Sequence, residues 1–159
     1  MSAAIWRRAA GAGLGMVALG LLAVLTGLPL LFPAIGASAA LMALSPDSKG
    51  ASARSCWLGH ALGALIGWAC LQLLAGGAGH SLAQAQAWPW VLSGSLALLL
   101  TVAALLWASI PHPPAAATTM IVGMGLLPEL WQVLALIAAA TATAGVAWVL
   151  QARQRSPAG

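Results

Sequence analysis

Charged residues are scarce in this sequence. Six Lys or Arg and two Asp or Glu make up 5% of the 159 residues, whereas a soluble domain carries about 25%. So few charges cannot cover a water-facing surface, which excludes a soluble globular domain. The six basic residues are scattered along the chain and form no basic stripe. Nucleic acid is therefore not an expected partner.

The motifs of catalysis are also missing. Both carboxylates, Asp47 and Glu129, fall in predicted turns, so no serine–histidine–acid set can form. There is no GxSxG, HExxH, Walker or dinucleotide motif. We therefore expect no enzyme, no catalytic residue and no cofactor.

Cysteine is nearly absent too. Cys56 and Cys70 lie on one predicted helix, about 21 Å apart at 1.5 Å per residue, too far for a disulfide. There is no CxxC and no metal-type His/Cys cluster in the sequence. Both cysteines are expected to be small apolar core residues, and no metal is expected.

Apolar residues dominate what is present. They make up 62% of the chain, and its mean hydropathy is +0.97. A bilayer-spanning helix needs about 20 apolar residues. We predict an all-α integral membrane protein with one domain over residues 1–159. Its long helices are expected at 9–28, 53–75, 88–110 and 130–150, and a polar tail is expected at 151–159.

One stretch interrupts this pattern: Ser109–Met120, which contains His112, Pro113 and Pro114. Proline removes a backbone donor and clashes with the preceding turn, so one helix should stop near Ile110. A second, short helix can start after the prolines, over residues 115–126. Its first N–H groups lack intrahelical partners, and hydrocarbon cannot satisfy them. This break is the best candidate for a functional site.

A second proline break lies 80 residues earlier. Pro33 corresponds to Pro113, Ala37 to Ala117 and Ser38 to Thr118, and the flanking long helices also correspond. Residues 9–76 and 88–150 are therefore predicted to be two repeats. Each has a long helix, a proline break, a short helix (34–44 in the first repeat) and a second long helix.

Positive charge then indicates the topology. If each short helix crosses the membrane, all six basic residues fall on the cytoplasmic side, as the positive-inside tendency requires. If the short helices re-enter, giving four crossings, Lys49 and Arg54 fall outside. Six crossings therefore fit the positive-inside tendency better than four. This topology makes the two repeats inverted and places both termini in the cytoplasm. Inverted repeats with broken helices are typical of channels and secondary transporters. The composition suits a bacterial inner membrane.

The His112-Pro113-Pro114 motif, followed by small residues and Thr118, resembles the signature of the HPP family of integral membrane proteins. The segment Pro33–Ser38 and the tripeptide Leu58-Gly59-His60 are similar to that family's first half. The resemblance covers about residues 9–150. Plant and cyanobacterial members are linked to nitrite transport, so the resemblance implies permeation of a small anion.

Helix N-termini and hydroxyl groups suit an anion better than a cation. We predict transport or channel activity for a small inorganic anion, nitrite first. The predicted substrate-binding residues are Gly36, Ser38, His60, His112, Pro113, Pro114, Thr118 and Thr119. A neutral solute stays possible. A protein of a different class also stays possible, namely a non-transporting membrane scaffold or accessory subunit in which the broken helices are packing features.

Each polar candidate also has a structural interpretation. His112 and His60 are either substrate or proton groups or hydrogen-bonding partners that hold helices together. Ser38 and Thr118 either face a solute or bond back to their own helices. The expected partners are the lipid bilayer, a small anion and further copies of the chain. A dimer is favoured because six helices, two of them short, hardly enclose a pore.

Overall fold

The computed structural model describes residues 3–79 and 87–155, which contain helices and no strand. The helices are α1 (Ala3–Thr26), α2 (Pro33–Leu44), the 3₁₀ turn η1 (Lys49–Ala51), α3 (Ala53–Ala75), α4 (Trp88–Trp107), α5 (Pro114–Gly123) and α6 (Leu130–Arg155). Three of them, α1, α3 and α4, are long and apolar enough to span a membrane. The predicted all-helical membrane fold is confirmed. Residues 80–86, between α3 and α4, lie outside the described residues.

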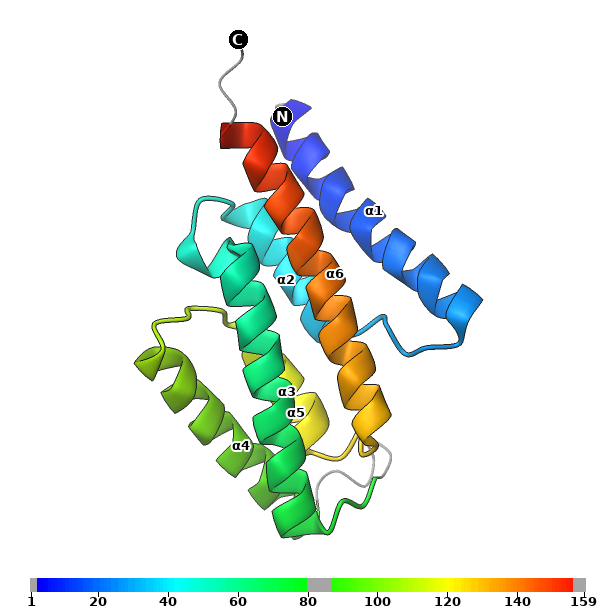
Figure 1. The fold of residues 1–159 in the computed structure, drawn as a ribbon, viewed down its shortest axis with the longest axis vertical. Coiled ribbons are helices and arrows are strands. Elements are labelled where there is room, and N and C mark those ends of the chain that lie inside the picture. Colours follow the sequence, from blue (N-terminus) through cyan, green and yellow to red (C-terminus); the bar gives the residue numbers. More distant parts are fainter. Residues whose placement is uncertain (1–2, 80–86, 156–159) are drawn as a thin grey trace.

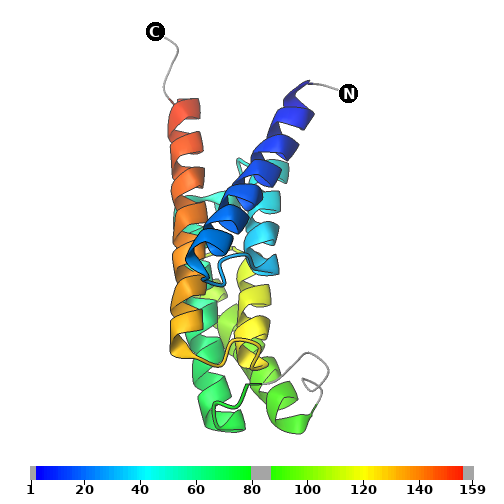
Figure 2. The same cartoon turned by 90° about the vertical axis from the view of Figure 1, so that its right-hand side faces the viewer.

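Consecutive helices run in alternating directions, so α1, α3 and α5 descend and α2, α4 and α6 ascend in Figure 1. The first turn of α1 and the last turn of α6 therefore lie at the same end of the bundle. The two short helices are stacked one above the other rather than side by side (Figure 2). Their proline-bearing N-termini point toward each other near the middle of the molecule, and α2 contacts α5 there.

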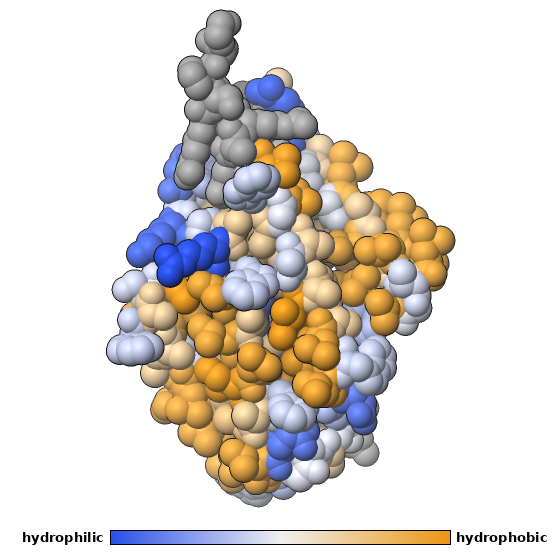
Figure 3. Space-filling model, in the orientation of Figure 1, coloured by the Kyte–Doolittle hydropathy of each residue, from blue (hydrophilic) through white to orange (hydrophobic). Residues whose placement is uncertain are grey.

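The outside of the bundle is apolar. Leu, Val and Trp side chains are exposed along α1, α4 and α6. Figure 3 shows hydrophobic residues over most of one face, with strongly hydrophilic patches toward its ends. A surface of this kind is stable against lipid, not water.

Three helices end earlier than predicted, and α1, which ends at Thr26 rather than residue 28, is the first of them. The α4 helix stops at Trp107 rather than near Ile110, because Ser109 adopts a left-handed conformation (φ 55°). The Ile110 amide then donates to the Leu105 carbonyl at 2.9 Å, a Schellman closure. The α5 helix stops at Gly123 rather than residue 126, and Gly125 (φ 76°) closes it in the same way. At the C-terminus, α6 continues to Arg155, so the predicted tail begins later than residue 151.

Helix α3 is the centre of the bundle, since it packs against α4, α5 and α6. Three glycines spaced by four residues, Gly59, Gly63 and Gly67, allow its backbone to approach α5 closely. A Cβ at Gly67 would lie 2.9 Å from the Thr119 carbonyl oxygen. Small residues at this spacing are a common means of helix contact in membranes. The glycine face thus holds α5, and with it the helix break, against α3.

We expect Gly63→Ala to destabilise the protein by about 1–3 kcal/mol, the usual range for overpacking. The added Cβ would lie 2.6 Å from the Thr119 hydroxyl and 2.8 Å from the Ala115 carbonyl oxygen, which is backbone and cannot turn away. Thermal unfolding in detergent, followed by tryptophan fluorescence, measures the change. Gly15→Ala is the matched control, because nothing lies within 4 Å of a Cβ there. Equal unfolding temperatures for the two variants would contradict the packing described.

The order long helix, short helix, long helix occurs twice, and each short helix has proline in its first turn. Packing differs between the halves, however. Helix α4 packs on α3 and α5, whereas α1 makes extensive contact with α2 alone. The inverted relation of the two halves therefore stays a prediction.

Candidate functional site

Four buried polar side chains meet where the two short helices approach each other. Ser38 comes from α2, His60 from α3, His112 from the segment before α5, and Thr118 from α5. The exposed fraction is 1% for His112 and 0% for the other three. We call these four residues the polar cluster. The predicted break therefore brings together residues up to 80 positions apart in the sequence.

The polar cluster forms one continuous hydrogen-bonded chain whose direction follows from one end. The Gly50 carbonyl can only accept, so Nδ1–H of His112 donates to it at 2.8 Å. In a neutral ring, Nε2 of His112 is then an acceptor, and the Ser38 hydroxyl donates to it at 3.0 Å. Ser38 in turn accepts from Nε2–H of His60 at 2.7 Å. Nδ1 of His60 is left to accept from the Thr118 hydroxyl at 2.6 Å.

Every donor in this chain has an acceptor, so the polar cluster is satisfied although it is buried. The Ser93 hydroxyl, by contrast, is the one buried side-chain polar atom without a partner in the described part of the chain. A satisfied buried network orients its members and fixes the packing of the segments that carry them. Here it joins α2, α3, η1 and α5.

The helix starts offer fewer free donors than predicted. Pro113 and Pro114 have no N–H, and the next two amides, of Ala115 and Ala116, donate to the carbonyls of His112 and Pro113 at 3.0 Å. At α2, the amides of residues 35 and 36 both donate to the Phe32 carbonyl. Tight turns and prolines therefore account for most of the N–H groups that were expected to be unsatisfied at these breaks. Side chains are the available donors instead.

The other predicted site residues lie outside the polar cluster. Thr119 is buried, but its hydroxyl bonds to Thr101 and to the Ala115 carbonyl, both at 3.0 Å. Gly36 is half-buried against Met16. Pro113 is exposed and Pro114 is buried in the first turn of α5.

Cys56 is buried in the core, as predicted, but it also lies beside two histidines, in a group that the sequence did not indicate. Its sulfur and one ring nitrogen each of His60 and His112 all lie within 4.8 Å of one another. The Nε2 atoms of the two histidines are 3.3 Å apart. Cys56 and His60 share a helix face because they are four residues apart, a spacing visible in the sequence. The approach of His112 to them is a tertiary feature.

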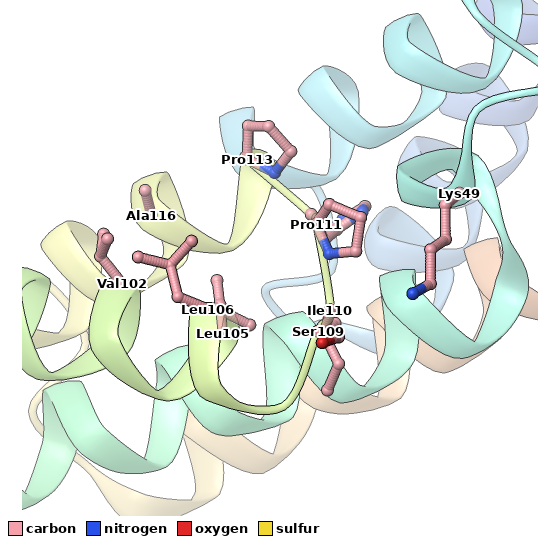
Figure 4. Close-up of a pocket in the computed structure, with 10 residues that line it drawn as sticks. Lys49, Val102, Leu105, Leu106, Ser109, Ile110, Pro111, Pro113 and Ala116 are labelled. Carbon is pink, nitrogen blue, oxygen red and sulfur yellow. The ribbon is translucent and has the colours of Figure 1, made fainter.

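A surface pocket of about 420 Å³ opens beside the break. Its lining is largely apolar, from α4 and the Ser109–Pro113 segment, but it also includes His112 and the exposed side chain of Lys49. Figure 4 shows Val102, Leu106 and Ala116 on one side of the Ser109–Pro111 segment and Lys49 on the other. His112 thus belongs both to the pocket and to the polar cluster. Lys49, which the sequence indicated only as a topology charge, is the one charged residue that lines the pocket.

Together, the apolar exterior, the alternating helices and the buried polar cluster define a multi-pass helical membrane protein with a polar centre. The model of the HPP transmembrane region matches residues 1–157. The chain therefore belongs to the HPP transmembrane region family, as its motif indicated. No curated protein and no solved structure matches the chain.

Proposed function

We propose that this protein transports a small inorganic anion, nitrite in the first place, through the polar cluster at the helix break. One observation carries the proposal: the polar cluster is a buried chain of donors and acceptors in an apolar membrane protein. Polar residues inside a membrane protein are costly and commonly mark substrate or proton pathways. The HPP family resemblance supports the same class.

Anion binding would use side-chain donors. The Ser38 and Thr118 hydroxyls and Nε2–H of His60 donate within the polar cluster, and each can be redirected to an anion that enters. Because all four residues are at most 1% exposed, an anion must displace part of the hydrogen-bonded chain to pass. That arrangement favours a gated carrier over an open channel.

Nitrite flux into proteoliposomes tests the proposal. We expect flux with the natural sequence and a large loss with Thr118→Val, which keeps the shape of the side chain but removes the hydroxyl that donates to His60. Thr141→Val is the matched control, since Thr141 is exposed and bonds only to its own helix. No flux of nitrite, nitrate or chloride by the natural protein would overturn the proposal and favour an accessory subunit. Equal flux in both variants would remove the polar cluster from the pathway.

Lys49 supplies positive charge at the pocket beside His112. We expect Lys49→Gln to lower nitrite flux by about 2- to 5-fold, the effect of one nearby exposed charge. The loss should shrink as ionic strength rises, because salt screens exposed charges. Arg54→Gln removes the same charge from an exposed residue that does not line this pocket. Equal losses for both variants would point to net charge rather than to the pocket.

The proposal includes an assembly and an orientation. Helix α1 packs mainly on α2, and none of its apolar span is buried within the chain. We propose a homodimer in a bacterial inner membrane, with both termini cytoplasmic. The molar mass in detergent and the labelling of cysteines placed near each terminus test these two points.

A further inference from the structure

We propose that Cys56, His60 and His112 form a binding site for a soft metal ion, Cu(I) in the first place. Each of the three residues offers one ligand atom, and these atoms lie within 4.8 Å of one another in a buried site. The inference does not rest on anion transport, although both proposals involve His60 and His112, because it concerns the binding of a metal ion alone.

The spacing of the two imidazoles fits one shared ion. Two nitrogens bound to one ion at 2.0–2.1 Å lie about 3.3–3.4 Å apart at the tetrahedral angle and about 3.5–3.6 Å apart at the trigonal angle. The Nε2 atoms of His60 and His112 are 3.3 Å apart. The two rings meet edge to face, with centroids 5.0 Å apart and planes at 72°, so both nitrogens approach one point without stacking of the rings.

The surroundings of the histidines are those of metal ligands. A ligating histidine usually donates its second N–H to a carbonyl or carboxylate, which fixes the ring. His112 makes this bond, from Nδ1 to the Gly50 carbonyl at 2.8 Å, and so presents Nε2 toward His60. On His60, Thr118 lies at Nδ1. When Nε2 binds the ion, the ring proton moves to Nδ1 and donates to the Thr118 oxygen.

Ser38 can make room for an ion and keep an acceptor for its hydroxyl. Its hydroxyl bridges the two Nε2 atoms, at 2.7 and 3.0 Å. The Ala34 carbonyl, 3.3 Å away on the same helix, offers the hydroxyl another acceptor. His112 also lines the surface pocket beside the break, so the site lies next to that pocket.

The charge of the site selects the ion. One thiolate and two neutral imidazoles carry a charge of −1, so Cu(I) gives a neutral complex, whereas Zn²⁺ leaves a net charge of +1. An unpaired charge in a dry interior is costly. Thiolate and imidazole ligands with no carboxylate also suit a soft ion. Binding replaces the S–H bond of Cys56 by an S–Cu bond and releases one proton to water, with no change in oxidation state.

The test uses the full chain purified in detergent, with Cu(I) kept reduced by ascorbate and competed against a Cu(I) chelator. We expect one copper ion per chain. The fine structure of its X-ray absorption spectrum should show one sulfur and two nitrogen neighbours. In Cys56→Ser the affinity should fall by more than about 10-fold, the least that even an outer partner of a metal site contributes. Cys70→Ser is the control, a second buried cysteine of α3 outside the site, and it should bind as the natural protein does.

Should Cys56→Ser fail to fold, His112→Asn replaces it, since asparagine preserves the donor to Gly50 and removes Nε2. Copper bound equally by Cys56→Ser and the natural protein would overturn the proposal, and so would the absence of copper from the natural protein. Retention of Zn²⁺ in preference to Cu(I) would overturn the charge argument and with it the choice of ion. No nitrite is present in this assay, so its result and that of the flux assay are separate.

Discussion

A His112→Ala variant will lose nitrite flux to the background level and will unfold at a clearly lower temperature. The substitution removes a ring that is 99% buried and leaves a cavity beside three polar groups. Those groups are the Gly50 carbonyl, the Ser38 hydroxyl and Nε2 of His60. Truncating a large buried side chain costs about 3–5 kcal/mol, and the Gly50 carbonyl, which loses its donor, adds about 1–3 kcal/mol. Flux into proteoliposomes and thermal unfolding in detergent measure the two effects.

A second variant separates the loss of transport from the loss of folding. The side-chain amide of asparagine takes the place of Nδ1 of the imidazole, so His112→Asn retains a donor for Gly50 but has nothing at the position of Nε2. We expect it to unfold closer to the natural protein than His112→Ala does, and still to carry no flux. Normal flux in His112→Asn would contradict a role for the His112–Ser38 bond in transport and would leave His112 a structural residue.

The helices were predictable because their causes are local. Apolar runs and prolines placed the long and short helices, and α3 has the predicted bounds of residues 53–75. The ends of α4 and α5 were misplaced, because proline marks the latest point at which a helix can stop, not the point at which it does. Ser109 in a left-handed conformation closes α4, and serine gives little warning of that conformation.

The candidate site was predictable only in part. Ser38, His60, His112 and Thr118 stood out as polar residues beside helix breaks in an apolar chain, and the structure brings them together. Their part in binding a substrate stays a prediction. Cys56 was missed, although its spacing from His60 was visible, because the third member of the group, His112, comes from 52 residues further along than His60.

The sequence pattern alone could not predict the roles of Gly50 and Lys49. Gly50 contributes a backbone carbonyl, which every residue has, and Lys49 is one exposed charge in a polar turn. Both matter only because η1 packs against the Ser109–Pro113 segment. That contact arises from the tertiary arrangement of α2, α3 and α5 and has no counterpart in local spacing.

The contact at Gly50 leads to the other large expected effect. A Cβ at this position would collide with the carbonyl oxygen of Pro111, and would also meet its carbonyl carbon at 3.4 Å. The obstacle is backbone held between α4 and α5, so η1 and the break must move apart in Gly50→Ala. The same displacement draws the Gly50 carbonyl away from Nδ1 of His112. His112 then loses the acceptor that sets the direction of the hydrogen bonds in the polar cluster.

We therefore expect Gly50→Ala to destabilise the protein by about 1–3 kcal/mol through overpacking, and to lower nitrite flux strongly although no cluster side chain changes. Gly36→Ala is the matched control, because a Cβ there meets only the end of the Met16 side chain, at 3.7 Å. Gly36 is also a predicted site residue, so unchanged flux in Gly36→Ala would confine the site to the polar cluster. Normal stability and flux in Gly50→Ala would show that the Gly50–His112 bond does not hold the cluster in its direction.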